Sequence, residues 1–314
     1  MKAPTKRERI LGGLWGSLVG DALGVPVEFM GRADVQRNPV TDMRGFGTHR
    51  QPAGTWSDDS SMLLCTVESL NEHGFSPADM AARFLRWGRE SYWTPHGDVF
   101  DMGIATSQAL NRIAAGKPPL ECGGVSEYDN GNGSLMRILP VALYPADLLS
   151  DSVVRLRQAS CITHAHLRSQ LACAFFGLVV GRLMDFPPRV AWEGAVIDFG
   201  GLCYKPENFA DYGHFKDVCN PRLPDFPECE IRSGGYVMET LTSAIWCLLT
   251  TENFHDCVLK AVNLGGDTDT TGCVAGGLAG VCYGIEAIAP EWLAALARKD
   301  DIGPLFDRFT DLVL

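Results

Sequence analysis

The chain has 314 residues, of which 46% are hydrophobic and 21% are charged, and its formal net charge is −11. This composition is typical of a globular protein with a large core, and the lack of a Ser/Gly-rich or Pro-rich linker predicts one domain spanning residues 1–314. The negative charge argues against binding to nucleic acid, which needs a basic face to meet the phosphates. It does not exclude a small anionic ligand, because metal ions or backbone N–H groups could meet the charge of that ligand.

A basic segment at residues 2–9 is followed by the apolar residues 10–20, an order that superficially resembles a signal peptide. The apolar run is eleven residues long, contains four glycines and ends at Asp21, so it is too short to cross a bilayer. No other segment of the sequence approaches a membrane span. We therefore expect a cytoplasmic protein with no membrane partner.

The sequence contains eleven cysteines, an odd number, and none of them forms a Cys-x-x-Cys pair. Most lie in apolar helical patterns, where cysteine behaves as a small hydrophobic residue. A disulfide framework or a zinc site is therefore disfavoured, and we expect the reduced, buried thiols of a cytosolic protein. Cys219 and Cys229 lie in an irregular segment and are the pair to check first.

Helical periodicity dominates the chain, and alternating strand patterns are almost absent. Ser76-Pro77 and Ala289-Pro290 place a proline where a first helical turn accepts one, so they mark two helix starts. The sequence therefore predicts an all-α fold, a compact multi-helix bundle in a single domain. Apolar residues recur at spacings of three and four in residues 7–23, 60–72, 77–90, 99–115, 133–144, 152–161, 166–184, 188–198, 235–250, 254–263, 271–286 and 290–298.

Two of the predicted helices carry a glycine at every fourth residue, the first from Gly12 to Gly24 and the second from Gly272 to Gly284. A glycine inside a helix costs about 1 kcal/mol relative to alanine, so two such rows need a structural reason. Glycines at this spacing leave a bare stripe on one side of a helix, along which another helix can approach closely. We predict that both helices are buried and that each passes close to a neighbour, the two helices themselves being one such pair.

Residues 200–234 show no clear period and contain four prolines. A structureless stretch of this length inside a domain is usually a functional lid or a disordered segment. It is too rich in aromatic residues for a simple linker, so we interpret it as an ordered flap. These aromatic residues are Tyr204, Phe209, Tyr212, Phe215 and Phe226.

Two short acidic segments carry the strongest functional signal. In the first, Asp58 and Asp59 follow Ser57 just before a predicted helix. Helix capping explains one such carboxylate, but two adjacent carboxylates repel each other unless water or a cation neutralises them. In the second, Asp267 and Asp269 follow a pair of glycines and would project from the same side of an extended loop.

Together the two acidic segments offer four carboxylates and the oxygens of nearby Ser and Thr residues, with no His or Cys close by in sequence. Such an all-oxygen ligand set suits the hard cations Mg²⁺, Mn²⁺ or Ca²⁺ rather than zinc. The spacing lacks the ligand pattern of an EF-hand. Because four carboxylates exceed what one magnesium ion usually takes from a protein, the sequence predicts a dinuclear metal site at one end of the bundle.

The acidic segments occur together with a glycine-rich stretch at residues 16–24, and in this combination the sequence resembles the ADP-ribosylglycohydrolase family over most of its length. The resemblance implies an all-α fold with a dinuclear magnesium or manganese centre. Glu28 matches a glutamate that acts near the metals in relatives, and Ser57 stands where many relatives have threonine. By position, the implied metal ligands are Ser57, Asp58, Asp59, Asp267, Asp269 and Thr270.

Further matches to this family concern the ligand. We interpret residues 131–137 as a glycine loop that opens a helix, whose free N–H groups could hold a pyrophosphate. His164 matches a histidine that reaches the substrate in relatives, whereas His166 is expected to be structural. Tyr236 matches an aromatic residue beside the ribose or adenine, with a core position as the alternative. The implied substrate-binding residues are Asp101, Asn132, Gly133, Ser134, His164 and Tyr236.

The resemblance implies metal-dependent hydrolysis of the glycosidic bond of an ADP-ribosylated protein or a small ADP-ribosyl conjugate. Asp101 matches an aspartate that faces the leaving group, and it could hold a guanidinium bidentately, which favours ADP-ribosyl-arginine over ADP-ribosyl-serine. We expect a monomer with two Mg²⁺ or Mn²⁺ ions, and Glu28, Asp58 and Asp269 as catalytic residues. A two-metal phosphoesterase is one alternative, and an ADP-ribose-binding or toxin-immunity protein is another.

Overall fold

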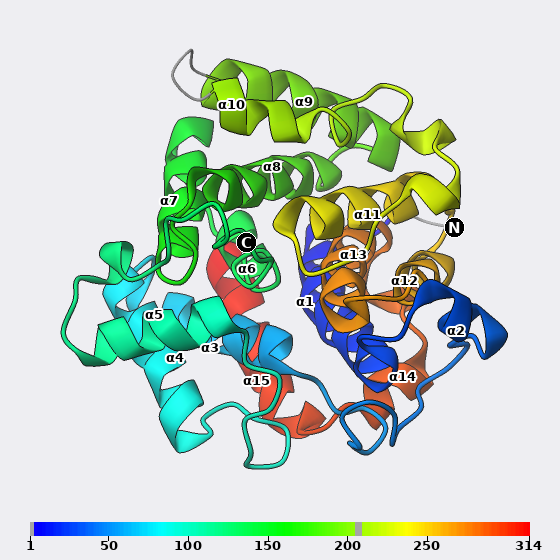
Figure 1. The fold of residues 1–314 in the computed structure, drawn as a ribbon, viewed down its shortest axis with the longest axis horizontal. Coiled ribbons are helices and arrows are strands. Elements are labelled where there is room, and N and C mark those ends of the chain that lie inside the picture. Colours follow the sequence, from blue (N-terminus) through cyan, green and yellow to red (C-terminus); the bar gives the residue numbers. More distant parts are fainter. Residues whose placement is uncertain (1–2, 205–208) are drawn as a thin grey trace.

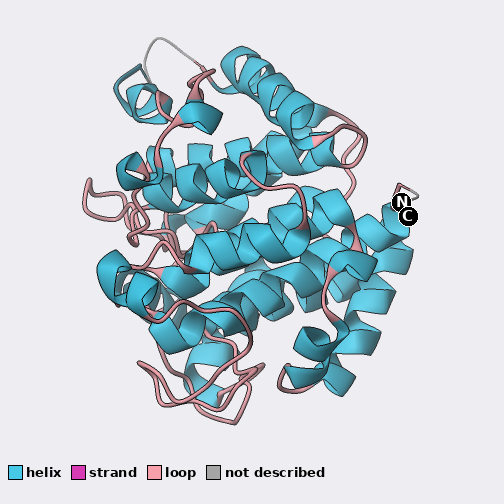
Figure 2. Ribbon diagram, turned by 90° about the vertical axis from the view of Figure 1, so that its right-hand side faces the viewer, coloured by secondary structure: helices cyan, strands magenta, loops and turns pink. Residues whose placement is uncertain are grey.

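The computed structural model describes residues 3–204 and 209–314 (Figure 1). Within these ranges the chain forms fifteen α-helices and no β-strand, so the predicted all-α bundle is confirmed. The loops that join the helices gather mainly along one side of the molecule (Figure 2). The helices are α1 (Lys6–Gly24), α2 (Arg32–Arg37), α3 (Asp58–His73), α4 (Pro77–Glu90), α5 (Ile104–Ala114), α6 (Leu139–Leu143), α7 (Leu149–Cys161), α8 (Leu167–Leu183), α9 (Pro188–Cys203), α10 (Phe209–Tyr212), α11 (Val237–Leu249), α12 (Phe254–Val262), α13 (Thr268–Tyr283), α14 (Pro290–Ala295) and α15 (Lys299–Val313).

Most of the predicted helices are present, and both predicted helix starts at Pro77 and Pro290 are confirmed. The helix predicted at 99–115 begins only at Ile104, because Asp101 has a φ of 55°, which an α-helix cannot accommodate. The helices α2, α10 and α15 were not predicted. In α15 the sequence Gly303-Pro304 ordinarily indicates a helix end, but burial of an apolar face outweighs this signal. The buried residues of that face are Ile302, Phe306 and Phe309.

The two glycine-striped helices, α1 and α13, pack against each other in antiparallel orientation near the centre of the fold (Figure 1). A Cβ atom on Gly16 would lie 2.3 Å from the carbonyl oxygen of Gly276, and one on Gly20 would lie 1.9 Å from that of Gly272. Carbon atoms do not approach other heavy atoms so closely, so only glycine permits this contact between the two backbones. The predicted close crossing of two buried helices is confirmed.

Residues Lys6–Val27, which comprise α1 and the turn after it, have the length and a mean hydropathy of 1.4 that would suit a membrane span. The sequence-based expectation that this segment is too short to cross a bilayer was therefore wrong, because it counted only the uninterrupted apolar run. Inside the protein, 94% of the most apolar window of this segment is buried, and its main partner is α13. It is the one helix in the described ranges that meets both criteria.

The segment interpreted as a flap is ordered where the structure describes it, although Pro206 lies outside the described residues. The ring of Tyr212 stacks on that of Phe199 in α9 with 5.0 Å between centroids, and the Trp192 indole N–H donates to the Val218 carbonyl oxygen over 2.8 Å. This part of the segment therefore packs on α9, through the ring of Tyr212 and the backbone at Val218. The thiols of Cys219 and Cys229 in this segment are both free.

Candidate metal centre and active site

The C-terminal end of α1 meets the N-terminal end of α13, and this junction positions the first part of the candidate site. Gly24 packs directly on Asp269, since a Cβ atom at Gly24 would lie 2.3 Å from the Asp269 Cα. The Thr268 hydroxyl donates a hydrogen bond of 2.8 Å to the Gly24 carbonyl oxygen. These contacts bring the turn that carries Glu28 next to the second acidic segment, although the two are far apart in sequence.

The first acidic segment is attached to the same junction by Asp21 of α1. The buried Asp21 carboxylate accepts hydrogen bonds from the Ser57 N–H at 3.0 Å, the Ser60 N–H at 3.0 Å and the Ser60 hydroxyl at 2.5 Å. Burial raises the pKa of Asp21 to about 6, while these hydrogen bonds act in the opposite direction. Sequence analysis did not assign Asp21 a role, although this residue lies within the glycine-rich stretch that carries the family resemblance.

Three carboxylates of the predicted ligand set are nearly inaccessible: Asp58 is 6% exposed, and Asp59 and Asp269 are each 1% exposed. Burial raises the pKa of all three groups well above the usual range, and the neighbouring carboxylates raise it further. The two acidic segments also touch, because the Thr270 hydroxyl lies 3.3 Å from an oxygen of Asp59 and donates to it. Such crowding of buried anions is unfavourable unless a cation neutralises it.

The pattern of unpaired oxygens fits a bound metal. Asp59 Oδ2, Asp267 Oδ1 and Asp269 Oδ2 are buried, and none of them has a hydrogen-bond partner among the described residues. A buried acceptor without a partner costs about 1–3 kcal/mol, and more when it is charged. One oxygen each of Glu28, Asp267 and Asp269 also lie within 4.8 Å of one another. Because all of these donors are oxygens, the set suits a hard divalent cation such as Mg²⁺ or Mn²⁺.

A cavity of about 310 Å³ opens above these carboxylates. Most of the residues predicted for the site line it together, whereas Ser57 and Asp269 lie beneath its surface. The predicted site residues that line the cavity are Glu28, Asp58, Asp59, Asp101, Asn132, Gly133, His164, Asp267 and Thr270.

The glycine loop is built differently from the sequence prediction. Residues 132–137 form turns, and the helix predicted from 133 begins only at Leu139, so the expected helix N-terminus at this loop is wrong. The physical reason is pairing with the segment before α11: the Asn132 N–H donates to the Gly235 carbonyl oxygen over 3.1 Å. The Asn132 side chain donates to Asp267 over 3.0 Å, so it orients a predicted metal ligand.

His164 lines the cavity as an uncharged ring. Burial lowers its pKa to about 3, and the charge of Arg137 acts in the same direction. The hydroxyl of Thr163 accepts from Arg137 and lies 2.9 Å from His164 Nδ1. The other ring nitrogen, Nε2, faces the glycine loop, where a Cβ atom on Gly131 would lie 3.4 Å from it. His164 thus presents a polar nitrogen to the loop, and its contact with the substrate stays a prediction.

Two other predicted substrate-binding residues do not line this cavity. Ser134 is fully buried and does not line the cavity, and its hydroxyl accepts a hydrogen bond of 2.9 Å from Ser160. A contact of this residue with the substrate stays a prediction. Tyr236 is half-buried and lines a separate cavity of about 730 Å³ between α11 and the flap, where its hydroxyl lies 3.3 Å from His214 Nδ1. His166 caps α8 by accepting from the Arg168 N–H, which fits its expected structural role.

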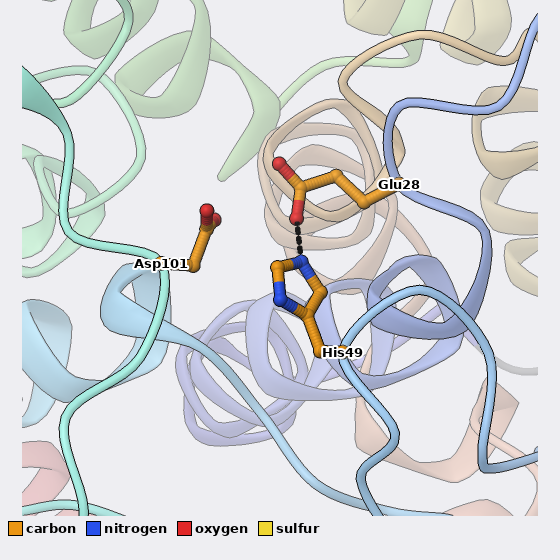
Figure 3. Close-up of side chains that lie close together, drawn as sticks. All are labelled: Glu28, His49 and Asp101. Atoms are coloured by element: carbon orange, nitrogen blue, oxygen red, sulfur yellow. Dashed lines mark hydrogen bonds and ion pairs between the residues drawn. The ribbon is translucent and has the colours of Figure 1, made fainter.

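The structure adds a residue that sequence analysis missed. His49 Nε2 lies 2.5 Å from Glu28 Oε2, and the two side chains point toward each other beside Asp101 (Figure 3). Burial raises the pKa of Glu28 to about 8 and also raises that of Asp101, and the hydrogen bond to Glu28 raises the pKa of His49. His49 lies in a loop without periodicity or a neighbouring motif, so no local signal could have identified it.

The fold is that of a family of hydrolases, as comparison with known proteins shows. A family model described as ADP-ribosylglycohydrolase matches residues 2–313, and the chain belongs to the ADP-ribosylglycohydrolase family. The chain is therefore a member of a family of hydrolases, as its sequence resemblance implied.

Two curated relatives and one solved structure illustrate the similarity. The ADP-ribosylarginine hydrolase Tri1 of Pseudomonas putida (strain GB-1) is 32% identical over 97% of this chain and 78% of that protein. The ADP-ribosyl-[dinitrogen reductase] glycohydrolase of Rhodospirillum rubrum is 31% identical over 95% of this chain and 94% of that protein. A solved structure described as an ADP-ribosylglycohydrolase-related protein complex is 33% identical in sequence and has a TM-score of 0.81. The match covers 98% of this chain and 99% of the chain in that structure.

Proposed function

We propose that this protein hydrolyses the glycosidic bond between ADP-ribose and an arginine side chain, with the help of two Mg²⁺ or Mn²⁺ ions. The observation that carries the proposal is a set of buried oxygens of Asp59, Asp267 and Asp269, at and beneath the surface of the cavity, that find no hydrogen-bond partner in the described ranges. The substrate is an ADP-ribosylated protein or a small ADP-ribosyl conjugate. The names of the relatives support this substrate class, and one of them specifies the arginine linkage.

Glu28 is the proposed proton acceptor for the attacking water. It lines the cavity and is 3% exposed, and one of its oxygens lies within 4.8 Å of oxygens of Asp267 and Asp269, so it is close to the place where cations would hold the water. Bound cations would orient the ribose hydroxyls and lower the pKa of a water molecule. The bond at the anomeric carbon breaks through an oxocarbenium-like transition state, the water oxygen bonds to that carbon, and the arginine side chain leaves.

The arginine linkage is favoured by the anionic groups beside the metal ligands. One oxygen of Glu28 and one of Asp101 lie within 4.8 Å of each other, and both residues line the cavity. A guanidinium is planar, always charged and able to bind a carboxylate through two N–H groups. A serine leaving group is neutral, so it gains no comparable electrostatic attraction from these two carboxylates. Asp101 is therefore the residue that we assign to the arginine leaving group.

The decisive experiment is an assay on arginine-, serine- and acetyl-linked ADP-ribose, each with Mg²⁺, with Mn²⁺ or with chelator. The wild type should release whole ADP-ribose from the arginine conjugate only when metal is present, and Asp58→Asn and Asp269→Asn should abolish the release. Full activity of either variant, or activity in chelator, would refute the metal-dependent scheme. Release of AMP in place of ADP-ribose would identify a phosphoesterase instead.

A further inference from the structure

The imidazole of His49 is held at one place beside Glu28, a residue that lines the cavity. The Thr48 N–H donates to the Pro26 carbonyl oxygen over 3.0 Å, and the Thr48 hydroxyl donates to the Glu28 carbonyl oxygen over 2.7 Å. Gly47 lies so close that a Cβ atom there would be 1.7 Å from the Pro26 oxygen. The loop at residues 47–49 is therefore hydrogen-bonded to the backbone at both Pro26 and Glu28, the two ends of the turn that presents the Glu28 side chain.

The ring of His49 is also enclosed by two aromatic side chains. Its centroid lies 6.0 Å from that of Phe29 and 5.2 Å from that of Phe100. The side chain is 16% exposed, so it is largely shielded from solvent. An enclosed ring with a fastened backbone has little freedom to rotate, and its Nε2 stays directed at Glu28 (Figure 3).

The carboxylate of Glu28 needs such a fixed partner because its other neighbours are anionic. Oxygens of Asp267 and Asp269 lie within 4.8 Å of a Glu28 oxygen, and an oxygen of Asp101 also lies within 4.8 Å of one. Repulsion from these groups would turn a freely rotating carboxylate away from the cavity. His49 is the residue that supplies a nitrogen donor to this carboxylate within the described part of the chain.

We propose that His49 is a positioning residue, which holds one oxygen of Glu28 so that the other faces the cavity where the attacking water is deprotonated. This inference rests on the proposed function, in which Glu28 is the proton acceptor. In this role His49 acts through Glu28 and ligates no metal, although one of its ring nitrogens lies within 4.8 Å of oxygens of Glu28 and Asp101, a grouping that could also hold an ion. Its removal should therefore lower kcat and leave KM and metal binding nearly unchanged, because binding of the substrate does not depend on how the Glu28 carboxylate is turned.

The central test compares His49→Ala with His49→Gln in steady-state release of ADP-ribose. A misplaced catalytic group lowers the rate by up to about 100-fold, so we expect His49→Ala to lower kcat between about 10-fold and 100-fold and KM to change less than about twofold. Glutamine carries an amide N–H at about the distance of histidine Nε2, so His49→Gln should restore most of the activity. Arg50→Ala alters an exposed neighbour in the same loop and should leave kcat unchanged.

A double-mutant cycle then asks whether His49 acts through Glu28. In a Glu28→Gln background, His49→Ala should produce little further loss, since the carboxylate that it positions is gone. An equal loss in both backgrounds would show that His49 acts elsewhere and would overturn the inference. Full activity of His49→Ala, or a His49→Gln variant that restores none of the lost activity, would overturn it as well.

Two measurements that do not depend on activity complete the test. The rise in Tm on addition of Mg²⁺ should be the same in His49→Ala as in the wild type, and loss of this rise would make His49 a metal ligand and overturn the positioning role. In ¹⁵N spectra, the His49 ring nitrogens should shift on Glu28→Gln, and unchanged signals would also overturn it. A wild type that releases no ADP-ribose from any conjugate would refute the proposed function, and the spectra would still test the contact between His49 and Glu28.

Discussion

The two oxygens of Asp21 accept hydrogen bonds from the Ser57 N–H at 3.0 and 3.1 Å, across the contact between α1 and α3. The N–H groups at the start of a helix have no partner within that helix, and Asp21 satisfies those of Ser57 and Ser60 from outside. Asp58 and Asp59 lie between these two residues. Their placement in the cavity therefore depends on an aspartate that does not itself line it.

Asp21→Ala should destabilise the protein and weaken metal binding together. The substitution leaves buried N–H groups of Ser57 and Ser60 without an acceptor, so we expect the free energy of unfolding to fall by about 2–4 kcal/mol. Urea denaturation measures this loss, and calorimetric titration with Mg²⁺ measures the affinity. Asp185→Ala, at an exposed position, is the control and should change stability by less than about 0.5 kcal/mol. Equal stability of the two variants would contradict the capping role.

Gly20→Ala should be among the most damaging single-methyl changes in the chain. The added Cβ would lie 1.9 Å from the Gly272 carbonyl oxygen, and neither backbone can yield without separating α1 from α13. Overpacking of this kind costs about 1–3 kcal/mol or more, and here it also disturbs the junction below the metal ligands. Thermal denaturation in the presence of chelator measures the loss without a contribution from metal.

The matched control for this clash is Gly181→Ala in α8. A Cβ atom at Gly181 would meet no atom of the described residues within 4 Å, so the same substitution removes only the helix penalty of glycine. It should raise the free energy of unfolding by up to about 1 kcal/mol. If both variants lost stability to the same extent, glycine composition rather than close packing would be responsible.

Some features of this fold and site depend only on residues that are close together in the sequence, and these features could be predicted. The spacing from Gly12 to Gly24 marks a bare helix face whatever the rest of the chain does, so the close packing of α1 followed from it. Asp58 and Asp59 likewise form an unfavourable pair on their own, so a cation could be inferred. The start of α5 was misplaced, because a positive φ at Asp101 interrupts an otherwise helical pattern.

Other features depend on contacts between distant segments, and sequence analysis missed them for that reason. His49 meets Glu28 only because its loop is hydrogen-bonded to the turn after α1. The sequence around Ser134 is typical of a ligand-binding loop, but the Ser134 hydroxyl accepts a hydrogen bond from Ser160 inside the protein. Asn132 pairs with the segment before α11 and so belongs to a turn and not to a helix. A periodic pattern contains no information about such partners.

Stability of the metal-free protein should fall as the pH rises. Burial raises the pKa of Asp21 to about 6 and that of Glu28 to about 8, against ordinary values of 3.8 and 4.5. Between the ordinary and the raised pKa, the folded protein binds more protons than the unfolded chain, so the free energy of unfolding decreases from about pH 4 to about pH 8. Thermal denaturation in chelator across this range measures the effect.

Added Mg²⁺ should reverse that trend, because a cation neutralises the ionised cluster. The rise in Tm on addition of Mg²⁺ should be larger near pH 8 than near pH 5, where protons compete with the metal. Asp59→Asn removes one of the oxygens without a hydrogen-bond partner and should lose most of this rise. Sodium chloride at matched ionic strength is the control for general screening. A rise in Tm that is independent of pH, or unchanged in Asp59→Asn, would place the ion elsewhere.

Asp101→Asn should change which linkage the enzyme prefers. The Asp101 carboxylate lines the cavity beside Glu28, and a guanidinium can bind it through two charge-assisted hydrogen bonds that an amide cannot match. Loss of a charge-assisted hydrogen bond costs about 1.5–3 kcal/mol, so kcat/KM for the arginine conjugate should fall by about 10-fold to 100-fold. The serine conjugate offers no cation to Asp101, and any activity toward it should fall by much less.

The control for this specificity change is Asp98→Asn, which removes the same charge from an exposed position in the same loop. Its effect on both conjugates should be small, because an exposed charge is screened by solvent and salt. Parallel losses on the arginine and serine conjugates in Asp101→Asn would mean that Asp101 acts on the ribose or on the metal ligands. A loss confined to arginine, and absent in Asp98→Asn, would assign Asp101 to the leaving group.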